Sequence, residues 1–270
     1  MTTAMDAMYT FSHDGVTFTV QPAEQGRHTV VFVNGLFGGG WIWEPVVATL
    51  KAQGYGTVVT AEPLAAHETA EDIPALLQSI SLLVDTLPDA SPILCGNSLG
   101  ALVAMELAAA EPSRWAGVIL SGAPGLGDEQ AADSFGSALR TPSLKLGDLI
   151  ADRLIHDKEL ITPALVERCT EALTPRIMLR AGRALRATRG YDARPLLGRI
   201  DVPVLLVCGA CDEVSSPTKW RAAVPMFPDA DYVEIAGAGH SPMLEQPNVF
   251  SDLLASWLDT IPAPLLSGTG

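Results

Sequence analysis

The chain of 270 residues carries a formal net charge of −14 and is 48% hydrophobic and 18% charged. This acidic balance excludes general binding to nucleic acids and to anionic membrane surfaces, because both partners attract a basic protein surface. The size fits one globular α/β domain with room for an inserted cap, and the apolar runs stop well short of the ~18 residues that a membrane-spanning helix needs.

The predicted elements alternate between strands and helices along most of the chain. The strands are short runs rich in β-branched residues. They cover residues 9–11, 16–20, 29–33, 56–61, 93–95, 117–121, 203–208 and 231–235, and the first two form an N-terminal hairpin. The helices end at glycine or proline signals and cover residues 43–52, 73–87, 101–110 and 248–260. This alternation predicts an α/β fold with a doubly wound, mostly parallel sheet.

The segment from about residue 125 to residue 197 breaks this alternation. It contains helical stretches and several Pro and Gly stops but no convincing strand. An insertion between two strands of a parallel sheet lies over the ligand site when it follows the carboxyl end of a strand. We therefore predict that residues 125–197 form a helical cap on a core made of residues 1–124 and 198–270.

A five-residue motif, Gly96-Asn97-Ser98-Leu99-Gly100, joins a predicted strand to a predicted helix. The pattern G-x-S-x-G is typical of a sharp turn on which a strained serine exposes its hydroxyl. Glycines on either side remove side chains that would clash, and the helix N-terminus favours negative charge nearby. A plain Gly/Ser turn is the alternative, and the flanking strand and helix favour Ser98 as a nucleophile.

A serine hydroxyl needs a base within hydrogen-bond reach and an acid that orients this base. Of the five histidines, His240 stands just after the last predicted strand and before the last helix. Asp212 follows the strand at 203–208 and is the predicted acid, with Glu213 and Asp128 as alternatives. A surface histidine and a solvated turn aspartate are the structural alternatives, but the order Ser…Asp…His, each after a strand, favours catalysis.

The oxyanion of an acyl-transfer reaction needs two backbone N–H donors. Leu99 follows the nucleophile and is predicted to supply one of them. The other is expected from the loop after the strand at 29–33, where Leu36 lies among four glycines that allow close backbone approach. This loop does not predict a phosphate cradle, because no Gly-Lys-Ser/Thr follows it.

Together these motifs resemble the α/β-hydrolase superfamily of esterases, lipases and C–C bond hydrolases. The resemblance is carried by four segments and the residues close to them, namely 30–35 with Trp43, 96–100, 209–212, and 239–242 with Glu245 and Pro247. It implies the α/β-hydrolase fold. The chain departs from the family at Asn34-Gly35, where His-Gly is usual, and at residues 61–68, which replace a usual Asp-x-Pro-Gly-x-Gly-x-Ser segment.

The residue at position 98 narrows the chemistry that the resemblance implies. Epoxide hydrolases and haloalkane dehalogenases of this superfamily use Asp at the corresponding position of this turn, called the nucleophile elbow, so Ser98 favours acyl chemistry. We expect hydrolysis of a carboxylic ester or lactone of a small apolar molecule, ahead of C–C bond cleavage in a ring-fission product and of thioester hydrolysis. A lyase or a catalytically idle binding protein on the same fold is the alternative from a different class.

Two groups of residues are predicted to contact the small-molecule substrate. Phe37, Trp41, Trp43 and Met243 are expected to line an apolar pocket, with core packing as the alternative. Arg183 and Arg186 recur at helical spacing in the cap. They are candidates for binding a substrate carboxylate or an acidic carrier domain, whereas a solvated helix face is the alternative.

Cysteine usage and the N-terminus add expectations about chemistry and location. Cys208 and Cys211 form a C-x-x-C pair that closes a strand, and no second Cys/His pair stands at ligand spacing, so neither redox chemistry nor zinc is expected. All four cysteines fit reduced thiols.

Residues 1–9 lack a basic region, which argues against a signal peptide and for a cytoplasmic protein. We predict no metal and no cofactor.

Overall fold

A computed structural model describes residues 7–87, 89, 91–127 and 146–264 of the chain. In this part of the chain one sheet of eight strands runs in the order β1-β2-β4-β3-β5-β6-β7-β8. The strands are β1 Tyr9–His13, β2 Val16–Gln21, β3 Thr29–Val33, β4 Gly56–Thr60, β5 Ile93–Asn97, β6 Gly117–Ser121, β7 Val204–Gly209 and β8 Ala230–Ile235. The pairs β1–β2 and β2–β4 are antiparallel, whereas the pairs β4–β3, β3–β5, β5–β6, β6–β7 and β7–β8 are parallel. The prediction of a doubly wound, mostly parallel sheet is confirmed.

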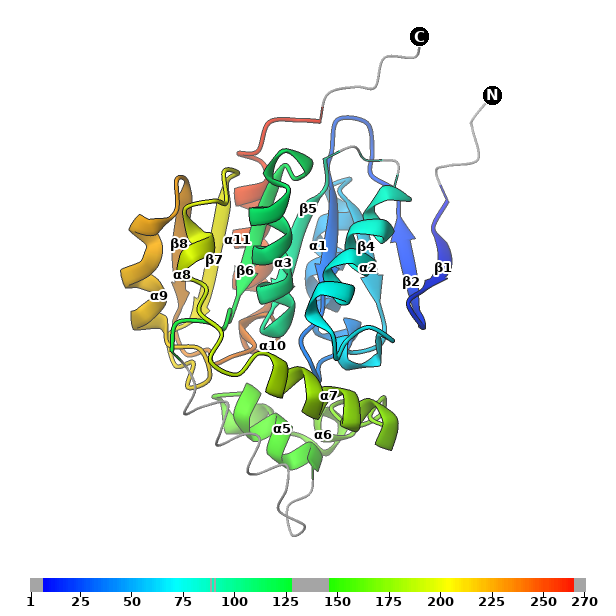
Figure 1. Cartoon of the computed structure of the whole chain (residues 1–270), viewed down its shortest axis with the longest axis vertical. Helices are drawn as coiled ribbons and strands as arrows, with labels where there is room; N and C mark the ends of the chain where they lie inside the picture. The colour runs from blue at the N-terminus through cyan, green and yellow to red at the C-terminus, as the bar shows by residue number, and fades with distance from the viewer. Residues whose placement is uncertain (1–6, 88, 90, 128–145, 265–270) are drawn as a thin grey trace.

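Helices cover both faces of the sheet (Figure 1). The α-helices are α1 Glu44–Ala52, α2 Ile73–Asp85, α3 Leu99–Ala110, α5 Leu146–Leu154, α6 Pro163–Arg168, α7 Pro175–Ala187, α8 Arg194–Leu197, α9 Pro217–Ala223, α10 Pro242–Glu245 and α11 Pro247–Leu258. Short 3₁₀ turns are η1 Gly40–Trp43, η2 Leu64–Ala66, η3 Pro112–Arg114, η4 Lys158–Leu160 and η5 Val224–Met226.

The core lies in two layers, one on each side of the sheet. Along β3 the fully buried side chains alternate, so that Val31 and Val33 join the layer under α2 and α3 while Val30 and Phe32 join the layer under α1 and α11. This alternation follows from the two-residue period of a strand. Strands buried on both faces explain why the sequence shows continuous apolar runs at these positions.

The helices between β6 and β7 stand apart from these layers. Figure 1 shows α5, α6 and α7 together beyond one end of the sheet, whereas α8 returns to pack against α3. Over residues 125–127 and 146–197 the structure contains helices and one isolated bridge between Leu126 and Asp192, but no strand. The division into core and cap at these residues remains a proposal.

Several predicted boundaries shift by a few residues. The helix expected at 73–87 ends at Asp85, and the strand before the elbow continues to Asn97. The last predicted helix is preceded by α10 and begins at Pro247, because proline is favoured in the first turn of a helix. Within the described residues, no helix has the length and apolar character needed to cross a lipid bilayer.

Candidate active site

Ser98 occupies a strained turn between β5 and α3. Its φ is 55° and its ψ is −123°, and Asp14 is the other residue besides glycine with positive φ in the described chain. Conformations of this kind cost about 1–3 kcal/mol and persist only where the surrounding structure holds them. Here the Ser98 N–H donates to the Ser121 carbonyl at 2.9 Å, so β6 fixes the turn.

The glycines on either side of Ser98 are required by close backbone packing. A Cβ atom at Gly96 would collide with the backbone of Gly100, and a Cβ atom at Gly100 would collide with the carbonyls of Val33 and Asn34. The elbow therefore presses directly on the end of β3. This contact brings Ser98 next to the glycine loop that follows β3.

His240 and Asp212 form a buried pair on the loops after β8 and β7. The Nδ1 of His240 lies 2.9 Å from Asp212 Oδ2. The other carboxylate oxygen, Oδ1, accepts hydrogen bonds from Val214 N at 2.7 Å and Ser215 N at 2.9 Å. Because a carboxylate only accepts, Nδ1 carries a proton, so in the neutral form of the ring Nε2 has a free lone pair.

The alternative acids differ sharply from Asp212 in position. Glu213 is exposed to solvent, so its carboxylate has no role in orienting a buried ring. Asp128 lies outside the described residues. Among the three candidates, Asp212 is the one that the structure brings to His240.

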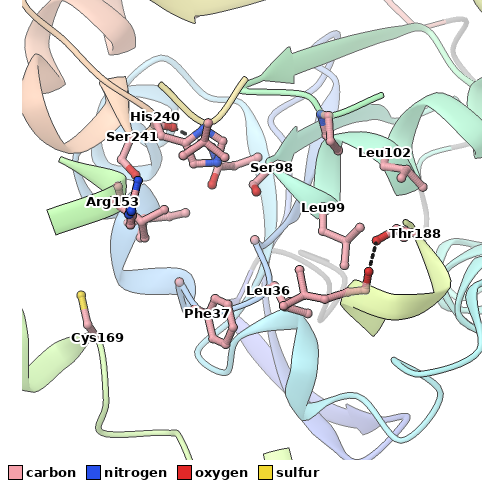
Figure 2. A pocket seen from close by; sticks show the side chains of 18 of the residues that line it. Leu36, Phe37, Ser98, Leu99, Leu102, Arg153, Cys169, Thr188, His240 and Ser241 are labelled. Carbon is pink, nitrogen blue, oxygen red and sulfur yellow. Dashed lines mark hydrogen bonds between the residues drawn. The ribbon is translucent and has the colours of Figure 1, made fainter. Parts of the chain in front are cut away.

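The free nitrogen of His240 and the hydroxyl of Ser98 belong to the same cavity (Figure 2). His240 Nε2 is buried and has no hydrogen-bond partner among the described residues, Ser98 included. In unliganded enzymes such contacts are often long and tighten only when substrate binds. The arrangement leaves a base with a free lone pair facing the space that the serine hydroxyl enters.

Two backbone N–H groups predicted to bind an oxyanion lie on this cavity as well. Leu99 is the first residue of α3, where N–H groups have no helical partner. Leu36 follows Gly35 in the loop after β3, and within the described chain neither N–H donates a hydrogen bond. Both donors are therefore available to a ligand.

The cavity has a volume of about 160 Å³ and mostly apolar walls. Phe37 and Trp41 line it as predicted, and Leu36 lines it as well, but Trp43 and Met243 do not. Both of these residues are fully buried in the core layer under α1 and α11, so core packing, the alternative that the sequence left open, is correct for them.

The cap arginines predicted to meet the substrate also lie elsewhere. Arg183 and Arg186 are exposed on α7, do not line the cavity, and Arg183 pairs with Glu71 at 2.6 Å. Two other arginines, Arg153 and Arg189, line the cavity instead. For Arg183 and Arg186 the alternative of a solvated helix face describes the structure better.

Asn34, at the position where the family usually has histidine, holds the loop after β3 in place. Its Nδ2 donates to the carbonyls of Thr60 at 3.0 Å and Glu62 at 2.7 Å. Its Oδ1 accepts from Trp43 Nε1 at 2.8 Å. The amide thus joins the loop after β3 to the loop after β4. Both of its polar atoms have hydrogen-bond partners, so asparagine is fully accommodated where the family usually has histidine.

Glu245 links the His240 loop to the end of α5, a role that sequence reasoning missed. Its buried carboxylate accepts hydrogen bonds from the backbone N–H groups of Gly239 at 2.6 Å, His156 at 2.7 Å and Asp157 at 2.9 Å. The available sequence signal is a glutamate shortly after the His240 motif. Sequence alone does not reveal its contacts with His156 and Asp157, because these residues are far from Glu245 in the chain.

Burial disfavours the reactive thiolate form of two cysteines, Cys169 and Cys208. Cys169 lies on the cavity wall, and burial raises the pKa of its thiol to about 11. Cys208 and Cys211 are free thiols, and burial raises the pKa of Cys208 to about 12. Among the described residues, no group of three or more His, Cys, Asp or Glu side chains is arranged to hold a metal ion.

Comparison with known proteins gives matches along nearly the whole chain. The profile of a family described as "Alpha/beta hydrolase family" matches residues 30–253. A pimeloyl-[acyl-carrier protein] methyl ester esterase from Neisseria meningitidis serogroup C is 27% identical over 227 residues, covering 80% of this chain and 84% of the relative. The 3-oxoadipate enol-lactonase 1 of Acinetobacter baylyi is 23% identical and covers 93% of this chain and 96% of its own length.

Solved structures of the same fold confirm the architecture. The enol-lactonase from Burkholderia xenovorans LB400 superposes with a TM-score of 0.78 at 22% identity, covering 93% of this chain and all of that chain. An esterase from Rhodococcus sp. ECU1013 gives a TM-score of 0.74 at 21% identity and covers 94% of this chain and 99% of its own.

Proposed function

The chain belongs to the alpha/beta hydrolase family, and from this premise we propose that it is a serine hydrolase that cleaves carboxylic esters or lactones of small molecules. One observation carries the proposal. The strained Ser98 opens onto the same cavity as His240, whose free Nε2 is oriented by the buried contact with Asp212.

In the proposed mechanism, His240 Nε2 takes the proton of Ser98 while Oγ attacks the substrate carbonyl carbon. The carbonyl oxygen becomes an oxyanion that the N–H groups of Leu36 and Leu99 stabilise. His240 then gives the proton to the leaving alkoxide as the C–O bond breaks, which leaves an acyl-enzyme. Water, deprotonated by His240, releases the acid and restores Ser98.

Asp212 contributes in two ways to this cycle. Its hydrogen bond to Nδ1 keeps the ring in the tautomer whose Nε2 accepts a proton, and its charge stabilises the imidazolium that forms. The two N–H donors on its other oxygen hold the carboxylate in place.

The substrate class is supported by the cavity and by the relatives. The walls are mainly leucine, isoleucine and aromatic side chains, which suits a small apolar acyl or alkyl group. Relatives named as a methyl ester esterase and an enol-lactonase support ester or lactone cleavage as the first candidate for this chain, with C–C bond and thioester cleavage as alternatives.

A panel of substrates tests this ranking. Purified protein is assayed with p-nitrophenyl esters of increasing acyl length, a lactone series, an acyl thioester and a vinylogous diketone that reports C–C cleavage. We expect the highest kcat/KM among the esters or lactones. Preferred turnover of the diketone would replace ester hydrolysis by C–C hydrolysis, and no turnover of any member would favour an idle binding protein.

A further inference from the structure

Arg153 brings an unpaired positive charge to the cavity. It is half-buried in the last turn of α5 and lines the cavity together with Ser98 and His240. Figure 2 draws its side chain on the wall next to Ser241 and His240. Within the part of the chain that the structure describes, Arg153 makes no hydrogen bond and no ion pair.

Other half-buried arginines of the described chain all have partners. Arg114 binds Ser81 and Asp85, Arg27 binds Asp259, and Arg180 donates to the Ala66 carbonyl at 2.8 Å. Leaving water without a compensating contact is costly for a charged group. Arg153 is therefore an exception that needs an explanation.

Stabilisation of the end of α5 does not explain this position. Basic residues are favoured near helix C-termini, where they interact with the last carbonyls. At the end of α5 a residue of the following turn η4 has this role, since Lys158 Nζ donates to the carbonyls of Asp152 at 2.6 Å and Ile155 at 2.9 Å. The guanidinium of Arg153 remains available for a ligand.

The contacts of Glu245 link the helix that carries Arg153 to the loop that carries His240. The carboxylate binds the N–H of Gly239, which precedes His240, and the N–H groups of His156 and Asp157, which follow α5 closely. The end of α5 and the His240 loop are thereby held together. Glu245 therefore ties the segment directly after Arg153 to the His240 loop.

We propose that Arg153 binds a carboxylate on the substrate, so that the preferred substrates are singly charged esters or lactones that carry a carboxylate away from the cleaved bond. This inference rests on the proposed ester or lactone hydrolysis and specifies its substrate class. Arginine stays protonated throughout the physiological range, and its planar N–H groups match the two oxygens of a carboxylate.

The charge balance favours a carboxylate over a phosphate. A phosphate monoester carries a charge of about −1.5 to −2 near pH 7, which one guanidinium does not neutralise. The remaining walls are largely apolar, and Arg189, the other arginine on the cavity, already has an interaction partner. One cation facing an apolar space matches one negative charge.

The test compares an anionic substrate with a neutral substrate of the same shape. Monomethyl esters of succinate, glutarate, adipate and pimelate are paired with methyl esters of equal length that end in a primary amide. The measured quantity is the ratio of kcat/KM for the acid to kcat/KM for the amide. In the unaltered protein we expect this ratio to exceed one and to peak at one chain length, because Glu245 ties the end of α5 to the His240 loop.

Arg153→Gln should lower this ratio by about 10- to 100-fold, mainly through KM, because a charge-assisted contact is lost. Arg153→Lys keeps the charge without the planar fork and should give an intermediate ratio. Arg186→Gln is the matched control, since Arg186 is exposed on α7 and outside the cavity. Thermal unfolding of each variant reports whether the fold is retained.

A ratio in Arg153→Gln equal to that of the unaltered protein within about twofold would overturn the inference, whatever happens to overall activity. Calorimetric binding of monomethyl adipate to Ser98→Ala and to Ser98→Ala/Arg153→Gln gives a readout without turnover. Tighter binding to the first protein supports the inference even if no ester is cleaved, and equal binding contradicts it. Absence of turnover in the unaltered protein counts against the proposed function instead.

Discussion

The end of the sheet and the helices between β6 and β7 both line the cavity, but they position their side chains differently. Ser98, Asp212 and His240 follow β5, β7 and β8, where backbone packing and buried hydrogen bonds determine each place. Arg153 and Cys169 come from the segment between β6 and β7, in which the end of α5 is tied to the His240 loop through Glu245. The comparison suggests that the sheet end supplies the chemistry and the helices supply substrate preference.

The largest effect is expected at Ser98, the proposed nucleophile at the end of the sheet. Ser98→Ala removes the attacking hydroxyl and should lower kcat for a p-nitrophenyl ester by about 10⁴- to 10⁶-fold. Steady-state kinetics with a freshly purified variant measures it. Ser113→Ala, at an exposed position in η3, is the control. A Ser98→Ala protein with near-normal kcat would mean that the sheet end does not supply the nucleophile.

The next effect concerns the acid that orients His240. Asp212→Asn places an amide where a carboxylate accepts from Nδ1, which favours the wrong tautomer, and kcat should fall by about 10⁴-fold. Glu213→Gln, at the exposed neighbouring position, should change kcat by less than about twofold. If the two variants behave alike, the assignment of the acid to Asp212 is wrong.

A glycine pair compares the two regions in stability. Gly100→Ala forces a Cβ against the backbone of Val33 and Asn34 and should lower the free energy of unfolding by about 3 kcal/mol or more. Gly182→Ala lies inside α7, where a Cβ meets only the end of Arg186 at 3.7 Å, and should raise it by about 0.5–1 kcal/mol. Urea unfolding measures both free energies. Equal changes in the two variants would contradict the idea that the turn at Ser98 tolerates substitution less than α7 does.

The smallest effect is expected at Cys169, the thiol that the helical region places on the cavity. Since burial raises its pKa to about 11, thiolate forms only as the pH approaches that value, and at pH 8 it is about one part in a thousand. Iodoacetamide at pH 8 should therefore modify the more accessible Cys211 first, as peptide mapping would show. Rapid labelling of Cys169 at pH 8 would reveal a second reactive group in the cavity.

The sequence predicted the sheet end well because its constraints are local. The sharp turn at Ser98 requires Gly96 and Gly100, which the sequence shows directly. An acid and a histidine that each follow a later parallel strand must lie at the same edge of the sheet as this turn. Ser98, Asp212 and His240 were thus identified from residue type and order. Their placement in the structure agrees with the prediction, and their catalytic roles await the variants above.

The contacts of the cavity wall could not be predicted in the same way. Trp41 and Trp43 are two residues apart in one 3₁₀ turn, yet the first lines the cavity and the second lies in the core bonded to Asn34. The clustered arginines of α7 predicted contact with the substrate, whereas Arg153, the arginine that lines the cavity from α5, belongs to no such cluster. Which side of a short element faces a cavity depends on tertiary packing, and the sequence period does not specify it.

Covalent labelling tests the central claim most directly. The intact protein is treated with a fluorophosphonate, digested, and the modified residue is located by mass spectrometry. The account predicts one adduct on Ser98, its absence in Ser98→Ala, and strongly reduced labelling in Asp212→Asn. An adduct on another residue, or an unmodified Ser98 in a protein that still cleaves esters, would contradict it.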